Sequence, residues 1–307
     1  MAPIGWRAEM GIEPTASLGI EHEALVEQPA HPVEQMDWRQ AREMAGIRYL
    51  EAGELGAPAI VFLHGIGGGA AALARQLAHF GRDWRAIAWE MPGYAGSAPL
   101  PLVTMEALAA TLAGFIETLG LERPVLVGHS LGGMVLQRLL VEAPQIARAV
   151  VLAQTSAAFG GRDPAWAEEF VAERLGPLDA GRSLAEMAPA AIAALVGEDA
   201  DAEGVALTRA CLAATPESTY RDMVLAMPGF DLRAALGRIA VPTLVLSGSR
   251  DAQAPAAGGA RMAALIPGAR HVVIEGAGHL AYAERPLAFN AAIETFLRDV
   301  GEERAGG

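Results

Sequence analysis

The stretch "VLVGHSLGGMVLQ", residues 125–137, places a serine between an apolar strand-like run and a helical pattern. Its centre is "GHSLG", residues 128–132, which is a G-x-S-x-G motif. Between a strand and a helix, this motif holds the serine on a strained turn with its hydroxyl clear of the sheet. Glycines are needed at both ends because neighbouring backbone comes too close for larger side chains. We therefore interpret Ser130 as a nucleophile.

Strand-like runs alternate with helical patterns on both sides of this motif. Apolar runs predict strands over residues 59–64, 85–90, 124–129, 147–154, 241–249 and 270–276. The 3.6-residue periodicity predicts helices over residues 70–80, 106–120, 131–143, 256–266 and 284–299. Repeated strand–helix units predict an α/β fold with a mostly parallel central sheet and helices on both faces.

The alternation stops over residues 157–235, which read as consecutive helices. Breaks in this block are expected at Gly160-Gly161, Pro177, Pro189, Pro216 and Pro228. We interpret the block as an inserted helical cap. An N-terminal extension over residues 1–36 is expected to be partly ordered. The core is predicted over residues 37–156 and 236–300, the cap over residues 157–235, and a short tail over residues 301–307.

The composition favours a large folded core and a small-molecule substrate. Of the 307 residues, 52% are hydrophobic and 19% are charged, which argues against general disorder. The net charge of −13 argues against nucleic acid or an anionic membrane as a partner. Neither a membrane-length apolar run nor a signal-peptide layout is found, so a cytoplasmic protein is expected, with homo-oligomerisation left open.

Residue usage removes several chemistries. A single cysteine, Cys211, excludes an intrachain disulfide and any cysteine-rich metal site. All 23 basic residues are arginine, which excludes Schiff-base chemistry, a Walker-type phosphate loop and a Ser-Lys dyad. The seven histidines form no H-E-x-x-H motif. We therefore expect neither a metal nor a cofactor.

A serine hydroxyl needs a base, and the usual base is a histidine held by a carboxylate. In proteins that carry the nucleophile in a G-x-S-x-G turn, the serine, the acid and the histidine follow one another in this order along the chain. If that order holds here, only His271 and His279, which come after Ser130, are candidates. His271 begins an apolar strand and is interpreted as structural. His279 lies in "EGAGHLAYAERP", residues 275–286, a glycine-rich loop before the last helix, and is the predicted base.

The acid should lie in a loop that follows a core strand. Asp251 in "LVLSGSRDAQAP" meets this condition and is the predicted acid. Asp231 precedes that strand and is interpreted as a helix N-cap. The other position open to an acid, after the preceding strand, holds Gln154, and a neutral amide cannot stabilise an imidazolium.

A rival interpretation comes from the glycine loop after the strand at 59–64. Its residues 65–70, "GIGGGA", satisfy the dinucleotide-binding pattern G-x-G-x-x-A, and Glu90 lies at about the spacing of a ribose-binding carboxylate. However, His64 opens the turn with a bulky polar side chain, and Glu90 is followed at once by Pro92-Gly93. The rival predicts a nucleotide-dependent oxidoreductase.

Four motifs together resemble the α/β-hydrolase superfamily, in particular its cap-bearing esterase and enol-lactonase-like branch. They are "HGIGGG" (64–69), "EMPGYAGS" (90–97), "GHSLGG" (128–133) and the pair "GSRDAQAP" with "GAGHLAYAERP". The resemblance spans residues 47 to about 299 and implies cleavage of a small, mostly apolar ester or lactone through an acyl-enzyme. The oxyanion would meet the backbone amide of Leu131, just after the nucleophile, and by resemblance that of Ile66, with Gly67 as the alternative second donor. A perhydrolase or acyltransferase with the same residues, and a ligand-binding protein with little turnover, are the alternatives.

The sequence also departs from this family. Glu90 and Ala95 stand where the family usually has Asp and Gly. His129 and Leu280 replace the Asn and Trp of carbon–carbon bond hydrolases, and Ser130 replaces the aspartate of haloalkane dehalogenases and epoxide hydrolases. These activities are therefore disfavoured. Side chains that could line a pocket under the cap are Phe159, Trp166, Phe170, Met187, Met223 and Met227.

Overall fold

The computed structural model describes residues 41–160 and 164–305. The predicted N-terminal extension, residues 1–36, lies outside the described residues. Eight strands are described: β1 (Arg42–Met44), β2 (Ile47–Ala52), β3 (Ala59–Leu63), β4 (Arg85–Trp89), β5 (Val125–His129), β6 (Ala149–Ala153), β7 (Thr243–Gly248) and β8 (Arg270–Ile274). Helices of the core are η3 (Ala70–Leu73), α1 (Ala74–Phe80), α2 (Met105–Thr118), α3 (Leu131–Glu142), η4 (Leu236–Arg238), α8 (Ala256–Leu265), α9 (Ala281–Glu284) and α10 (Pro286–Ala305).

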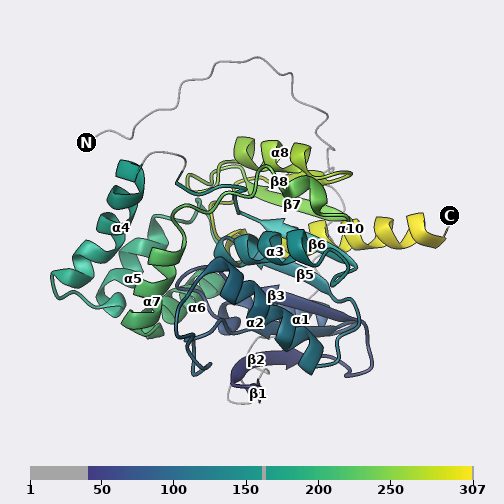
Figure 1. Ribbon diagram of the computed structural model, residues 1–307, viewed down its shortest axis with the longest axis horizontal. Coiled ribbons are helices and arrows are strands. Elements are labelled where there is room, and N and C mark those ends of the chain that lie inside the picture. The colour runs from purple at the N-terminus through teal and green to yellow at the C-terminus, as the bar shows by residue number, and fades with distance from the viewer. Residues whose placement is uncertain (1–40, 161–163, 306–307) are drawn as a thin grey trace. The chain divides into compact units, whose positions relative to one another are not determined.

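The eight strands form one sheet in the order β1-β2-β4-β3-β5-β6-β7-β8 (Figure 1). All pairings from β4 to β8 are parallel, whereas β1 and β2 join antiparallel at one edge. The central strands β3, β5, β6 and β7 are almost fully buried, as expected when helices cover both faces. The predicted mostly parallel sheet with helices on both faces is confirmed.

The sequence predictions missed strands β1 and β2. Strand β1 is three residues long and largely exposed, so it leaves no apolar run. Strand β2, "IRYLEA", mixes buried and half-buried positions and carries charged residues, as antiparallel strands with one wet face do. Its pairing with β4, in which Tyr49 lies opposite Trp89, continues the core to this edge.

Four helices lie in the segment predicted as the cap, and we call them the cap helices. They are α4 (Pro164–Asp179), α5 (Leu184–Ala193), α6 (Ala202–Ala214) and α7 (Glu217–Ala226). Figure 1 shows them gathered beside the sheet, at the left of the view. Chain order places them between β6 and β7.

The prediction that Pro177 and Pro189 break helices is wrong, because they lie inside α4 and α5. A proline inside a helix leaves the carbonyl four residues earlier without its hydrogen bond. Those carbonyls belong to Glu173 and Ala185, which are exposed, so solvent can supply the bond. In addition, α10 continues to Ala305, past the predicted end of the core at residue 300.

Candidate active site

Ser130 lies at the junction of β5 and α3 with φ 50° and ψ −115°. This is a left-handed conformation that costs a residue other than glycine about 1–3 kcal/mol. A Cβ on Gly128 would lie 2.6 Å from the Gly132 carbonyl oxygen, and one on Gly132 would lie 2.7 Å from the His64 carbonyl oxygen. The turn thus requires both glycines of the motif, for the reason expected from the sequence.

His279 connects Ser130 to Asp251. Its Nε2 lies 3.1 Å from the Ser130 Oγ, and its Nδ1 lies 2.9 Å from the Asp251 Oδ2. The three residues follow strands β5, β7 and β8, so they meet at the carboxyl ends of the parallel strands. The structure therefore brings together the three residues predicted as nucleophile, acid and base.

Asp251 is buried, and its charge is satisfied from two sides. While its Oδ2 faces His279, its Oδ1 accepts the backbone amides of Gln253 and Ala254 at 2.8 and 2.9 Å. Burial by itself raises the pKa of Asp251, but the His279 contact and the two amides outweigh it and hold the pKa below its usual value. The carboxylate form, which an imidazolium needs as its partner, is thus favoured.

The rival residues lie elsewhere. His271 Nε2 contacts the Ser247 Oγ at 3.0 Å on the neighbouring strand. Asp231 accepts the Arg233 backbone amide and pairs with the Arg233 side chain. The prediction of a helix N-cap at Asp231 is wrong, because Asp231 forms an isolated β-bridge with Ala158 and the next helix, η4, begins only at Leu236.

The loop of residues 64–70 passes directly against the nucleophile. A Cβ on Gly65 would lie 2.8 Å from the His129 Nδ1 and 3.1 Å from the Ser130 Cβ. Within the loop, Gly67 donates its amide to the Tyr94 hydroxyl at 3.1 Å, and Gly68 donates to the Gly65 carbonyl at 3.0 Å. Among the described residues no acceptor meets the amide of Ile66. The Leu131 amide is the first of α3, and amides of a first helical turn have no partner inside the helix.

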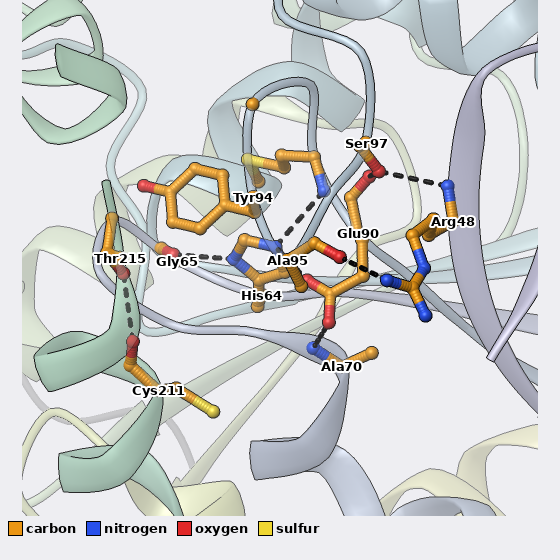
Figure 2. Close-up of polar contacts among 12 residues, drawn as sticks. Arg48, His64, Gly65, Ala70, Glu90, Tyr94, Ala95, Ser97, Cys211 and Thr215 are labelled. Carbon is orange, nitrogen blue, oxygen red and sulfur yellow. Dashed lines mark hydrogen bonds and ion pairs between the residues drawn. The ribbon is translucent and has the colours of Figure 1, made fainter. Parts of the chain in front are cut away.

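A buried polar network underlies this loop (Figure 2). Glu90 accepts the Ala70 amide through its Oε1 at 3.0 Å. His64 donates from Nδ1 to the Gly65 carbonyl at 2.8 Å and accepts the Met91 amide at Nε2 at 3.2 Å. Burial lowers the pKa of His64 to about 4 and raises the pKa of Glu90 to about 7. Both side chains thus fix the backbone of the loop from its inner side.

The same geometry counts against a dinucleotide at this loop. Glu90 is buried and bonded to the Ala70 amide, so it is not placed to meet a ribose hydroxyl. A Cβ on Gly67 would lie 2.6 Å from the Leu212 side chain, so a cap helix fills the space that a pyrophosphate would need. The interpretation as a ribose and pyrophosphate site is therefore not supported.

His129 supports the base, a role that the sequence did not reveal. Its Nε2 donates to the His279 carbonyl at 2.7 Å, and its ring packs against those of His279 and Tyr282. Burial lowers the pKa of His129 to about 3, so the ring is neutral. In the sequence only the position of His129 next to Ser130 pointed to a role in the site. Spacing along the chain does not show that the His129 side chain contacts His279, which is 150 residues further on.

A cavity of about 310 Å³ opens above Ser130 and His279. Its walls come from the loop of residues 65–68, from the ends of β5 and β6, and from the cap helices. Of the six side chains considered as candidates for its lining, Phe159, Met187 and Met227 line it. Trp166 and Phe170 instead stack on each other, and Met223 is fully buried. The apolar lining suits a small substrate with an apolar body.

Residues 41–160 and 164–305 contain neither a candidate metal site nor a helix suited to span a membrane. In these ranges no three His, Cys, Asp or Glu side chains gather in a way that could hold a metal ion. No helix in these ranges has the length and apolarity that a membrane crossing requires.

Comparison with known proteins places the chain among hydrolases. Residues 58–286 match the family described as alpha/beta hydrolase fold. The chain is 27% identical over 266 residues to 3-oxoadipate enol-lactonase 2 of Acinetobacter baylyi, covering 85% of this chain and 96% of that protein. The crystal structure of a hydrolase from Pseudomonas aeruginosa is 31% identical, with a TM-score of 0.74 over 82% of this chain and 94% of that one.

One further match is to a much longer protein. The chain is 28% identical over 258 residues to polyketide synthase ThaQ of Burkholderia thailandensis. The match covers 81% of this chain but spans only 12% of the length of the synthase.

Proposed function

Because the chain belongs to the alpha/beta hydrolase fold family, we propose that it is a serine hydrolase that cleaves carboxylic esters or lactones. The observation that carries this proposal is His279, whose two ring nitrogens face the Ser130 hydroxyl and the Asp251 carboxylate. The similarity to 3-oxoadipate enol-lactonase supports a lactone or a related ester as the substrate.

In the proposed reaction His279 Nε2 takes the proton of Ser130 as the hydroxyl oxygen attacks the carbonyl carbon. The carbonyl oxygen becomes an oxyanion. When the carbon–oxygen bond breaks, His279 returns the proton to the leaving alkoxide, and the acyl group stays on Ser130. Water, deprotonated by the same nitrogen, then attacks the acyl-enzyme and releases the acid. Asp251 holds the imidazole tautomer and stabilises its protonated form.

The oxyanion is stabilised by the backbone amides of Ile66 and Leu131. The Ile66 amide has no acceptor among the described residues, and its loop lies against Ser130. The Leu131 amide has no partner inside α3, because it belongs to the first turn of that helix. Each such donor contributes about 3–4 kcal/mol to the transition state. The cap helices enclose the substrate over Ser130, which gives residues 157–235 the role of a substrate-binding cap.

Labelling with a fluorophosphonate probe tests this proposal, combined with a panel of short esters and lactones. The wild-type protein should gain one probe per chain on Ser130 and hydrolyse members of the panel. Ser130→Ala should take up no probe and lose turnover while its circular dichroism spectrum is unchanged. Wild-type rates in the Ser130→Ala variant would contradict the assignment of the nucleophile.

A further inference from the structure

An arginine of the cap helices lines the cavity and forms no ion pair within the described part of the chain. Arg174, on α4, lines the cavity together with Tyr220 of α7 and Gln253 of the loop after β7. Apart from the histidines, Arg174 is the one positively charged residue among the described lining residues, and its neighbour Glu173 is the one negatively charged residue. Glu173 is exposed, whereas Arg174 is half-buried.

The guanidinium of Arg174 is held in place without being neutralised. It lies 3.8 Å from the centre of the Phe170 ring, and its Nη2 donates to the Gln253 Oε1 at 3.3 Å. In the described ranges no carboxylate lies within ion-pairing distance of it. By contrast, Arg75, Arg85 and Arg221 all pair with Asp or Glu side chains.

Burial is unfavourable for this charged group and lowers the pKa of Arg174, although the nearby Tyr220 and Glu173 act in the opposite direction and offset part of the effect. An anion entering the cavity would relieve this cost. A guanidinium presents a planar fork of donors that fits a carboxylate with two parallel hydrogen bonds.

A second donor lies close to Arg174. Tyr220 lines the same cavity, and its hydroxyl has no hydrogen-bond partner among the described residues. Helices α4 and α7 pack against each other, and Arg174 and Tyr220 interact electrostatically. Burial raises the pKa of Tyr220, so the hydroxyl stays protonated and can donate a hydrogen bond to an anion. The remaining cap wall is apolar, with Met187, Ile192 and Leu212 among its members.

We propose that Arg174, assisted by Tyr220, binds a carboxylate that the substrate carries at the end of a short apolar chain. This rests on the proposed function, and it makes the substrate a half-ester of a dicarboxylic acid or a lactone with a carboxylate side group. A single arginine and a phenol match one negative charge. The apolar wall matches the methylene groups between the carboxylate and the ester carbonyl.

Two pairs of substrates test the proposal, each pair differing only in charge. Monomethyl glutarate and its primary amide place the carboxylate, or the amide that replaces it, on the acyl side of the ester. The acetate ester of 4-hydroxybutanoate and its amide place it on the alcohol side. The readout is the ratio of kcat/KM for the carboxylate over kcat/KM for the amide. Variants are Arg174→Gln, Arg174→Lys and Tyr220→Phe, with Glu173→Gln as the control one residue away on α4.

The wild-type ratio should be about ten- to a hundredfold in one of the two pairs, as hydrogen bonds between charged groups provide. Arg174→Gln should bring the ratio close to one. Arg174→Lys should retain part of it, Tyr220→Phe should reduce it, and Glu173→Gln should preserve or increase it. A wild-type ratio near one in both pairs, or an equal loss in Glu173→Gln, would overturn the proposal.

Failure of the proposed function gives a different result. If neither pair is hydrolysed and no fluorophosphonate binds Ser130, the protein is not a serine hydrolase. If Ser130 is labelled and both members of each pair are hydrolysed equally, only the role of Arg174 is wrong.

Discussion

At the level of single residues, the site combines a strained backbone at the serine with hydrogen bonds that fix the buried carboxylate and the histidine. Ser130 is strained, Asp251 is buried with two amides on one oxygen, and His279 is held through its carbonyl by His129. Sequence order and loop position were sufficient to predict that Ser130, Asp251 and His279 lie together. The contact made by His129 depends on how the loop after β8 folds back over β5, which spacing along the chain does not reveal.

Replacing the acid should separate Asp251 from its rival. Asp251→Asn should lower kcat by about 10³–10⁴-fold, because the amide cannot stabilise the imidazolium and favours the wrong tautomer. Asp231→Asn should change kcat by less than about twofold, since that side chain binds Arg233 on the surface. Steady-state kinetics on one ester decides, and the reverse ranking would move the acid to Asp231.

The buried carboxyl of Glu90 should make stability depend on pH. Its pKa is about 7 when folded and near 4.5 when unfolded, so the folded state binds the proton more tightly. The stabilisation is complete below pH 4.5 and is lost as pH rises through 7, by up to about 3 kcal/mol.

Urea unfolding at pH 5 and pH 8 measures this effect in the wild type and in Glu90→Gln. The wild type should lose about 2–3 kcal/mol more than the variant between the two pH values. His64, whose folded pKa is about 4, gives a slope of the opposite sign in both proteins. Its Nε2 lies 3.5 Å from the Glu90 Oε2, so the difference between the two proteins contains the effect of Glu90 on His64 as well as the titration of Glu90 itself. Equal losses in the two proteins would show that Glu90 is ionised at both pH values.

At the scale of secondary-structure elements, the close approach of turns decides which glycines matter. Strands β3 and β5 are neighbours, so the turn after β5 meets the turn after β3. Gly132 lies at this contact, next to the backbone of Leu63 and His64. By contrast, Gly114 lies on α2, where an added Cβ would have open space within 4 Å.

These two glycines form a matched pair for mutation. Gly132→Ala should destabilise the protein by more than about 2 kcal/mol and lower kcat, because backbone atoms at 2.7 and 2.8 Å cannot move aside. Gly114→Ala should stabilise it by about 0.5–1 kcal/mol, since alanine is the better helix former. Thermal unfolding measures both changes, and a fully stable, fully active Gly132→Ala protein would contradict the described turn.

Elements were predictable where one pattern dominated. The buried strands β3, β5, β6 and β7 are continuous apolar runs, and α2 and α3 have clear helical periods. The short edge strands carry no such run. Pro177 and Pro189 do not end their helices, because a helix tolerates a proline where solvent reaches the freed carbonyl.

At the scale of the whole molecule, the sheet order unites segments far apart in the sequence. Residues after β3, β5, β7 and β8 converge at one edge, and the cap helices add the wall that faces them. Motif order predicted this convergence, including the serine, acid and base. It could not predict that Arg174 and Tyr220 face the cavity, because helical periodicity does not tell which partner a cap helix packs against.

In the proposed reaction Ser130 carries the acyl group between two steps. Mixing the protein with para-nitrophenyl acetate on the millisecond scale, followed by acid quenching and peptide mass spectrometry, tests it most directly. We expect a burst of nitrophenol that matches the enzyme concentration, and an acetyl group on the peptide that contains Ser130. Hydrolysis without a burst, with no acetyl group on Ser130 at any time, would contradict it.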